Sequence, residues 1–171
     1  MITTSSPALA TPHVRIERRF PYPRDVVFDA WTKPELLAQW FAPRGCTLRF
    51  ESIDVRDGGG FHACLHNPSF GDCWTLATYR EIVRPERLSF SWRIADAKGN
   101  AVSPQSQGHD TDWPAETIVS VEFIVEPNGT LVRLSQNVSE ALAKRTGAHP
   151  SWLQMFEMLG EQLAHRASRP T

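Results

Sequence analysis

Apolar side chains recur at every second position between residue 46 and about residue 138, and turn sequences interrupt this alternation at short intervals. A period of two is typical of β-strands that bury one face and expose the other. In RLSFSWRIA, Leu88, Phe90 and Trp92 share one face, while serines and an arginine lie on the other. Together with a similar segment near the N-terminus, the pattern predicts seven strands, at residues 14–20, 46–55, 60–67, 73–83, 87–95, 116–126 and 130–138.

The alternation also assigns an inward face to most of these strands. It leaves His62 and His66 toward solvent, and it does not decide the facing of residues 73–83, because neither face of that segment is cleanly apolar. The residues expected to face inward are Phe61, Ala63, Leu65, Leu88, Phe90, Trp92, Ile94, Thr117, Val119, Val121, Phe123, Val125, Val132, Leu134, Gln136 and Val138.

Residues 23–41 instead carry apolar side chains at helical spacing, with an interruption around Pro34. Thr32 and Glu35 match a capping box, and proline is tolerated in the first turn of a helix. We therefore expect two short helices that meet at an angle directly after the first strand.

A longer helix is expected near the C-terminus. His149 or a nearby residue is expected to cap it, and Pro150 lies in its first turn. A short helical turn, which Gly147 ends in a left-handed conformation, is expected before it. The apolar stripe of the long helix consists of Trp152, Met155, Phe156, Leu159 and Leu163.

These elements predict an α+β fold in which a single long helix must cover a broad antiparallel sheet. The helix is roughly 10 Å across, whereas seven flat strands would span about 30 Å. The sheet must therefore curl around the helix, and the space that remains between them is expected to form an apolar cavity.

The order of several segments resembles one branch of the START-like superfamily, the Hsp90-ATPase-activator-like proteins. The segments are RRFPYPRDVVFDAWTKPELLAQWFAP, IDVRDGGGFHACLHN, YREIVRPERLSFSW, ETIVSVEFIVEPNGTLVRLSQ and HPSWLQMFEMLGEQL. The resemblance covers about residues 14–164 and implies a helix-grip fold, but it carries over no catalytic residue. We expect residues 14–166 to form one domain, with flexible tails at 1–13 and 167–171.

Composition excludes several classes of partner. The net charge of the 171 residues is −1, which does not favour nucleic acid or an anionic membrane. Three cysteines without a CxxC pair suit a reducing compartment, and neither a signal peptide nor a membrane span is indicated. We expect a cytoplasmic protein without a cofactor, and both a monomer and a homodimer stay open.

The segment GGGFHACLHN raises two alternatives, and we set both aside. Residues 58–63 fit the dinucleotide pattern G-x-G-x-x-A, but a strand follows where that pattern requires a helix. His62 and Cys64 could share a zinc ion, whereas His62 and His66, about 13 Å apart on one strand, could not. The glycines therefore indicate a tight turn or bulge, and no metal site is expected.

The polar segment 96–115 is much longer than a hairpin requires. Trp113 in this segment is either a lid over the mouth of the cavity or part of a mobile exposed loop. Asp110 and Asp112 could hold a cation, although a solvated turn is the simpler interpretation.

Cavity-lining candidates come from the helices and from the inward strand faces. Gln136 stands out among them, because an inward amide needs hydrogen-bond partners from a backbone group, a water molecule or a ligand. The candidates are Trp40, Phe41, Phe61, Trp92, Phe123, Gln136, Trp152, Met155, Phe156 and Leu159.

The leading hypothesis is the binding of a small apolar or aromatic molecule without a reaction. A polyketide cyclase, dehydratase or hydrolase is an alternative, and it requires an ionisable side chain inside the cavity. Tyr79 or His62 could serve only if the face assignments are inverted. An Hsp90-associated co-chaperone is a further alternative.

Overall fold

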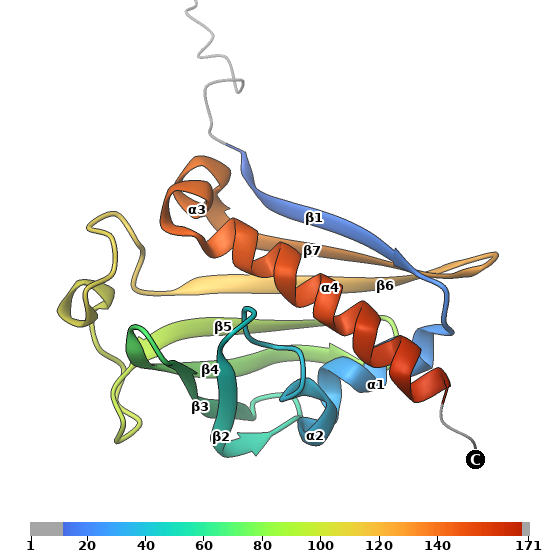
Figure 1. Ribbon diagram of the computed structural model, residues 1–171, viewed down its shortest axis with the longest axis horizontal. Helices are drawn as coiled ribbons and strands as arrows, with labels where there is room; N and C mark the ends of the chain where they lie inside the picture. The colour runs from blue at the N-terminus through green and yellow to red at the C-terminus, as the bar shows by residue number, and fades with distance from the viewer. Residues whose placement is uncertain (1–11, 169–171) are drawn as a thin grey trace, which may run out of the picture.

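A computed structural model describes residues 12–168, which fold as one seven-stranded antiparallel sheet with a long helix across it (Figure 1). The strand order is β1-β7-β6-β5-β4-β3-β2, so the last strand of the chain pairs with the first. This confirms the α+β helix-grip prediction. The strands are β1 His13–Phe20, β2 Thr47–Asp54, β3 Gly60–Asn67, β4 Gly71–Val83, β5 Arg87–Ala95, β6 Thr117–Glu126 and β7 Gly129–Ser139.

The strand β1 already begins at His13, the last residue of the predicted tail; residues 1–11 of that tail and residues 169–171 lie outside the described residues. Within residues 12–168, no helix is both long and apolar enough to cross a lipid bilayer.

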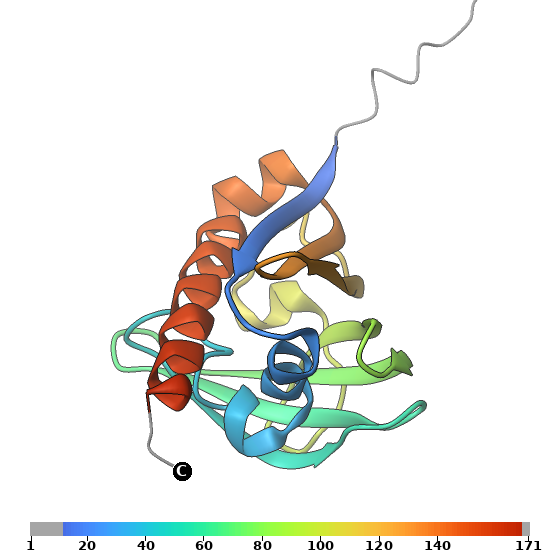
Figure 2. The same cartoon turned by 90° about the vertical axis from the view of Figure 1, so that its right-hand side faces the viewer.

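The helix α4 (Ala148–Ala167) runs along the concave side of the sheet, and Figure 2 shows the strands curling around it. Gly147, with φ 88°, separates α4 from the short helix α3 (Glu140–Thr146), as predicted, and it is also the N-cap of α4 in place of His149. All five residues of the predicted apolar stripe of α4 are buried.

Two short helices follow β1, as predicted: α1 (Arg24–Thr32) and α2 (Pro34–Leu37). The capping box was a wrong prediction. Thr32 belongs to the last turn of α1, where its hydroxyl donates to the Phe28 carbonyl at 2.9 Å, and Lys33 is the N-cap of α2 without a side-chain bond. A threonine late in a helix finds the carbonyl four residues back more readily than it caps the next helix.

Strand pairing decides the facing of β4. Thr75 lies opposite Ala63 of β3 and Ile94 of β5, whose side chains face inward. Because facing alternates along a strand, Cys73, Thr75, Ala77 and Tyr79 share the inner side. The two faces of β4 are both partly polar, so the sequence of this strand does not show which one is buried. The pairing with β3 and β5 decides it.

The predicted burial of two side chains was wrong. Val125 is 63% exposed, because β6 pairs with β5 only as far as Glu122 and the sheet beyond that point lacks this neighbour. His62 lies on the outer face but is buried, because the turn after β5 covers it and the Asp96 carbonyl accepts a hydrogen bond from its Nε2 at 2.9 Å. His66 is exposed, as expected.

The core is closed at one end of the helix α4. There α1 packs Phe28 and Trp31 against Phe123 of β6, with ring centroids 5.1 and 6.0 Å apart. Trp40 stacks edge-on against Trp31 at 4.6 Å and donates its indole N–H to the Ala30 carbonyl at 2.9 Å. The α1 and α2 pair therefore fills the space between sheet and helix at the C-terminal end of α4 (Figure 1).

Candidate functional site

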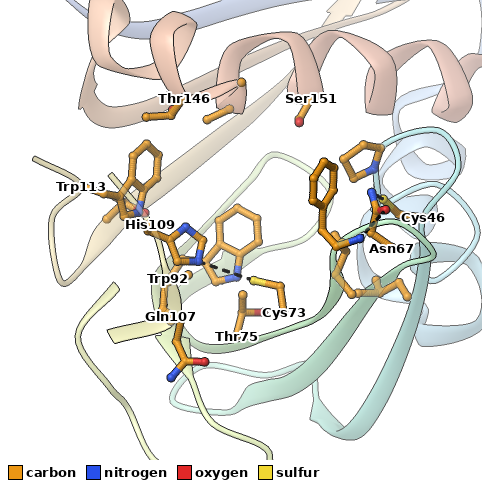
Figure 3. Close-up of a pocket in the computed structure, with 18 of the residues that line it drawn as sticks. Cys46, Asn67, Cys73, Thr75, Trp92, Gln107, His109, Trp113, Thr146 and Ser151 are labelled. Atoms are coloured by element: carbon orange, nitrogen blue, oxygen red, sulfur yellow. Dashed lines mark hydrogen bonds between the residues drawn. The ribbon is translucent and has the colours of Figure 1, made fainter. Parts of the chain in front are cut away.

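A pocket of about 890 Å³ opens at the N-terminal end of α4, where α1 and α2 do not fill the space between the helix and the sheet. The strands β3 to β5 form its floor, the first half of α4 forms its roof, and the segment between β5 and β6 closes one side (Figure 3). The predicted cavity is therefore present between the curled sheet and the C-terminal helix.

Several aromatic rings line the inner end of the pocket. Phe41 and Trp92 stack with centroids 5.4 Å apart at 27°. Trp152 of α4 lies 5.9 Å from each of these two rings, so the three aromatic rings form a continuous apolar wall. Such a wall offers dispersion and stacking contacts to a flat apolar molecule.

The most chemically distinctive feature of the pocket is a pair of polar side chains. His109, from the loop after the short helix η2 (Pro104–Gln107), approaches Cys73 of β4 with Nε2 3.9 Å from Sγ. Burial lowers the pKa of His109 and raises the pKa of Cys73. Both groups are therefore neutral near pH 7, and they act as a weak donor and acceptor pair rather than as a thiolate and imidazolium.

Gln136, the inward amide of β7, has its partners inside the protein. Its Oε1 accepts the indole N–H of Trp152 at 2.9 Å, and its Nε2 donates to the Thr117 hydroxyl at 3.1 Å. Side chains thus supply the hydrogen bonds that the sequence left open among backbone, water and ligand. Gln136 lines the pocket, but its main contribution is to fix the orientation of Trp152.

The segment between β5 and β6 is anchored to α3. Arg145 donates from Nη2 to Asp110 at 2.9 Å and to Asp112 at 3.0 Å, and this contact lowers the pKa of Asp110. The same segment places Trp113 on the pocket wall. The two aspartates that could have formed a cation site are therefore occupied by one guanidinium.

The pocket mouth faces the turn between β3 and β4. Phe70 in this turn is 90% exposed, although it lines the opening. Nearby, the Asn67 amide donates to Cys46 Sγ at 3.3 Å, which joins the end of β3 to the residue before β2. An exposed phenylalanine at an opening provides an apolar rim next to solvent.

The structure brings most of the predicted ligand residues together and leaves others elsewhere. Trp40 and Phe123 belong to the closed core, because α1 and α2 occupy their end of the sheet. Phe156 and Leu159 likewise lie further along α4 within that core. The predicted residues that line the pocket are Phe41, Phe61, Trp92, Gln136, Trp152, Met155 and, in the loop, Trp113.

Sequence reasoning missed His109 and Cys73. Cys73 was missed because the facing of β4 stayed ambiguous. His109 lies in the long segment that was identified as functional or mobile, so a signal was present in the combination of loop length, a histidine and the nearby Trp113. The two candidate acid–base residues lie elsewhere: His62 is on the outer face, and Tyr79 is packed in the core against Phe61 and Phe90.

The GGGFHACLHN segment forms the turn before β3 and the whole of β3. Gly58 has φ 79°, and a Cβ on Gly60 would collide with the Ala77 carbonyl of β4. This confirms the turn interpretation of the glycines. His62 packs against Trp74 at 4.8 Å, while His66 donates to Asp72 at 2.7 Å. Across residues 12–168, no three potential ligands from His, Cys, Asp and Glu cluster as a metal site would require.

The family described as activator of Hsp90 ATPase homolog 1-like protein matches residues 21–164. The chain belongs to this family. The match confirms the resemblance found in the sequence, and it begins a few residues later than the expected start at residue 14. No curated protein matches the chain.

Solved structures from bacteria share the fold of this activator-like family member. A protein from Staphylococcus epidermidis has 21% identity and a TM-score of 0.75, with 99% of this chain and 98% of that chain covered. A protein from Arthrobacter aurescens has 17% identity, a TM-score of 0.75 and 92% coverage of both chains. The AHSA1 protein from Silicibacter pomeroyi has 18% identity and a TM-score of 0.70, and covers 91% of this chain and 99% of its own.

Proposed function

We propose that the protein binds a small, largely apolar aromatic molecule in the pocket between the sheet and α4. The observation that carries the proposal is the open, aromatic-lined pocket of about 890 Å³ beside an otherwise closed core. Pockets of about 300–1,000 Å³ with apolar walls and a few polar groups are typical of small-molecule sites.

The wall residues have distinct roles in this proposal. Phe41 and Trp92 form a stacked surface on one side, and Trp152 faces it from α4. Gln136 keeps the Trp152 ring in place through a hydrogen bond at 2.9 Å. Because these contacts are made within the protein itself, a flat ligand meets preformed walls and loses little free energy to ordering them.

Thermal unfolding with a panel of aromatic compounds tests the proposal. At a ligand concentration about tenfold above Kd, binding adds about 1.4 kcal/mol to the free energy of unfolding, which raises Tm by about 3–6 °C. No shift with any compound of the panel, naphthalene and 2-naphthol included, would contradict binding.

Two phenylalanine substitutions on one strand show whether the pocket is the binding site. Thr75 lines the pocket, whereas Thr78 on the same strand is exposed on the outer face. Thr75→Phe places a ring in the pocket and should abolish the ligand-induced Tm shift. Thr78→Phe, the matched control, should leave the shift intact, and equal loss in both variants would place binding elsewhere.

A hydrolase or related enzyme is the second candidate, and His109 is the observation in its favour. The imidazole is neutral and opens into the pocket, as a general base requires. Its neighbour Cys73 has a raised pKa and is therefore a poor nucleophile. Hydrolysis of 2-naphthyl acetate that disappears in His109→Gln would support the enzyme, while a rate equal in both proteins would support binding alone.

A further inference from the structure

The charged side chains of the pocket are already paired with groups outside it. Four charged residues line the pocket: Arg44, Asp72, Arg93 and Asp110. Arg44 pairs with Glu161 at 2.6 Å and with Glu157 at 3.6 Å.

The other three have partners as well. Arg93 pairs with Glu116, His66 donates to Asp72 at 2.7 Å, and Arg145 donates to Asp110 at 2.9 Å. Each of these four residues therefore already has a hydrogen-bonding partner, with which an ionic ligand would have to share it.

The hydrogen-bonding groups that remain are neutral. His109 contacts Cys73 through Nε2 only, and a neutral imidazole carries one donor and one acceptor nitrogen. Figure 3 shows Cys73 and Trp92 on the sheet side of the pocket, across from Ser151 of α4.

Trp92 supplies an independent indication of a missing acceptor. Its indole N–H is buried and has no hydrogen-bond partner among residues 12–168. An unpaired buried donor is unfavourable, and a protein normally satisfies it with a carbonyl, a side-chain oxygen or a bound molecule. The nitrogen is covered in this conformation, so a ligand oxygen can reach it only if neighbouring side chains move.

Resting on the proposed function, we propose that the ligand is an uncharged aromatic molecule with one neutral hydrogen-bonding group, such as a phenol, placed at His109 and Cys73. Its ring lies against Phe41 and Trp92. A hydroxyl group both donates and accepts, so it matches either tautomer of His109 and can also serve the Trp92 indole. Carboxylates and amines of the same shape are disfavoured, because they lose hydration without gaining an unpaired opposite charge.

Three probes of one shape test this inference: naphthalene, 2-naphthol and 2-naphthoate. Their dissociation constants are measured by quenching of tryptophan fluorescence. We expect 2-naphthol to bind about 5–10-fold more tightly than naphthalene, which corresponds to one net neutral hydrogen bond. We expect 2-naphthoate to bind at least about tenfold more weakly than 2-naphthol.

Substitutions assign the difference to the polar pair. His109→Phe should remove the advantage of 2-naphthol while the naphthalene constant changes less than about twofold. Cys73→Ala should reduce the advantage by a smaller factor, because a thiol hydrogen bonds weakly. His165→Phe is the matched control, since His165 lies on an exposed face near the end of α4 and should leave all three constants unchanged.

The outcomes separate this inference from the proposed function. Equal constants for the three probes would overturn the ligand class and leave pocket binding intact, and so would the tightest binding by 2-naphthoate. A His109→Phe variant that folds normally by thermal unfolding but weakens all three probes equally would show that His109 only shapes the pocket. Failure of every probe to bind would overturn both proposals.

Discussion

The indole N–H of Trp152 donates to Gln136 Oε1 at 2.9 Å, so the roof of the pocket is hydrogen bonded to β7 beneath it. Gln136 is only 2% exposed and also donates to Thr117. One amide thus fixes the orientation of an aromatic wall and satisfies two other buried polar groups. The hydrogen bonding of the pocket and the stability of the fold therefore depend on the same side chain.

Gln136→Leu should lower the free energy of unfolding by about 2–3 kcal/mol, because it leaves the Trp152 indole and the Thr117 hydroxyl without their partner. Urea denaturation measures the change. Ser135→Ala, at an exposed position of the same strand, is the control and should change the value by less than about 0.5 kcal/mol. Equal effects of the two substitutions would contradict the role of Gln136.

Arg145 fastens the segment that carries His109 and Trp113, through Asp110 and Asp112. Because this contact is solvent-exposed, Arg145→Ala should cost less than about 1 kcal/mol of stability. It should nevertheless speed amide hydrogen exchange in residues 105–115, which mass spectrometry can follow.

Lys144 provides the control for that experiment. Its ion pair is with Glu140 inside α3, and not with the segment between β5 and β6. Lys144→Ala should therefore leave exchange in residues 105–115 unchanged. Faster exchange in both variants would mean that α3 as a whole, and not the Arg145 contact, holds the segment.

His109 makes stability depend on pH in a defined direction. Burial lowers its pKa from the usual 6.5, so the unfolded chain takes up this proton at a higher pH than the folded protein. The free energy of unfolding is unaffected well above 6.5 and declines as pH falls below that value, until the folded protein is protonated as well.

His109→Gln should therefore show a shallower decline than the wild type as the pH falls below the usual histidine pKa of 6.5. Urea denaturation at several pH values measures the two slopes. Asp110 does not interfere, because its lowered pKa places its own contribution below the usual carboxyl value of 3.8. Parallel curves for the two proteins would show that the His109 environment is not as buried as described.

Gly160, in the middle of α4, is a position for a stabilising change. A Cβ there would meet the Phe20 ring at 3.6 Å, an ordinary contact. Gly160→Ala should raise the free energy of unfolding by about 0.5–1 kcal/mol, because alanine favours helix interiors. Gly60→Ala should lower it, since its Cβ would collide with the Ala77 carbonyl, and a loss in both variants would contradict the described packing of α4.

Much of the fold could be predicted from the sequence, because local periodicity determines which strand residues face inward and which residues form the apolar stripe of α4. Leu88 and Phe90 of β5 are buried as their alternation predicts. The position of Val125 could not be predicted, because its exposure depends on where the neighbouring strand ends. The facing of Thr75 likewise depends on its partners in β3 and β5.

The site was predicted less completely than the fold. A sequence distinguishes apolar from polar side chains, but it does not show which apolar side chains the helices α1 and α2 cover. Phe41 and Trp40 are adjacent in the chain, yet Phe41 lines the pocket while Trp40 is bonded into the closed core. His109 contacts Cys73 although the two residues lie 36 positions apart in the chain. The contact depends on the conformation of a long loop, which the periodicity of the sequence does not predict.

The indole N–H resonances of the tryptophans offer the most direct test of an open aromatic pocket, because they report from three environments. Trp92, Trp113 and Trp152 line the pocket. Trp31 and Trp40 belong to the closed core, and Trp74 packs on the outer face against His62. The six tryptophans of the chain are thereby divided into a pocket set and a reference set.

Titration with 2-naphthol in a ¹H–¹⁵N NMR experiment should shift the resonances of the pocket set progressively and leave those of the reference set in place. That result would locate a small aromatic molecule between the sheet and α4. Unchanged pocket resonances at saturating 2-naphthol, or equal shifts in both sets, would contradict the account.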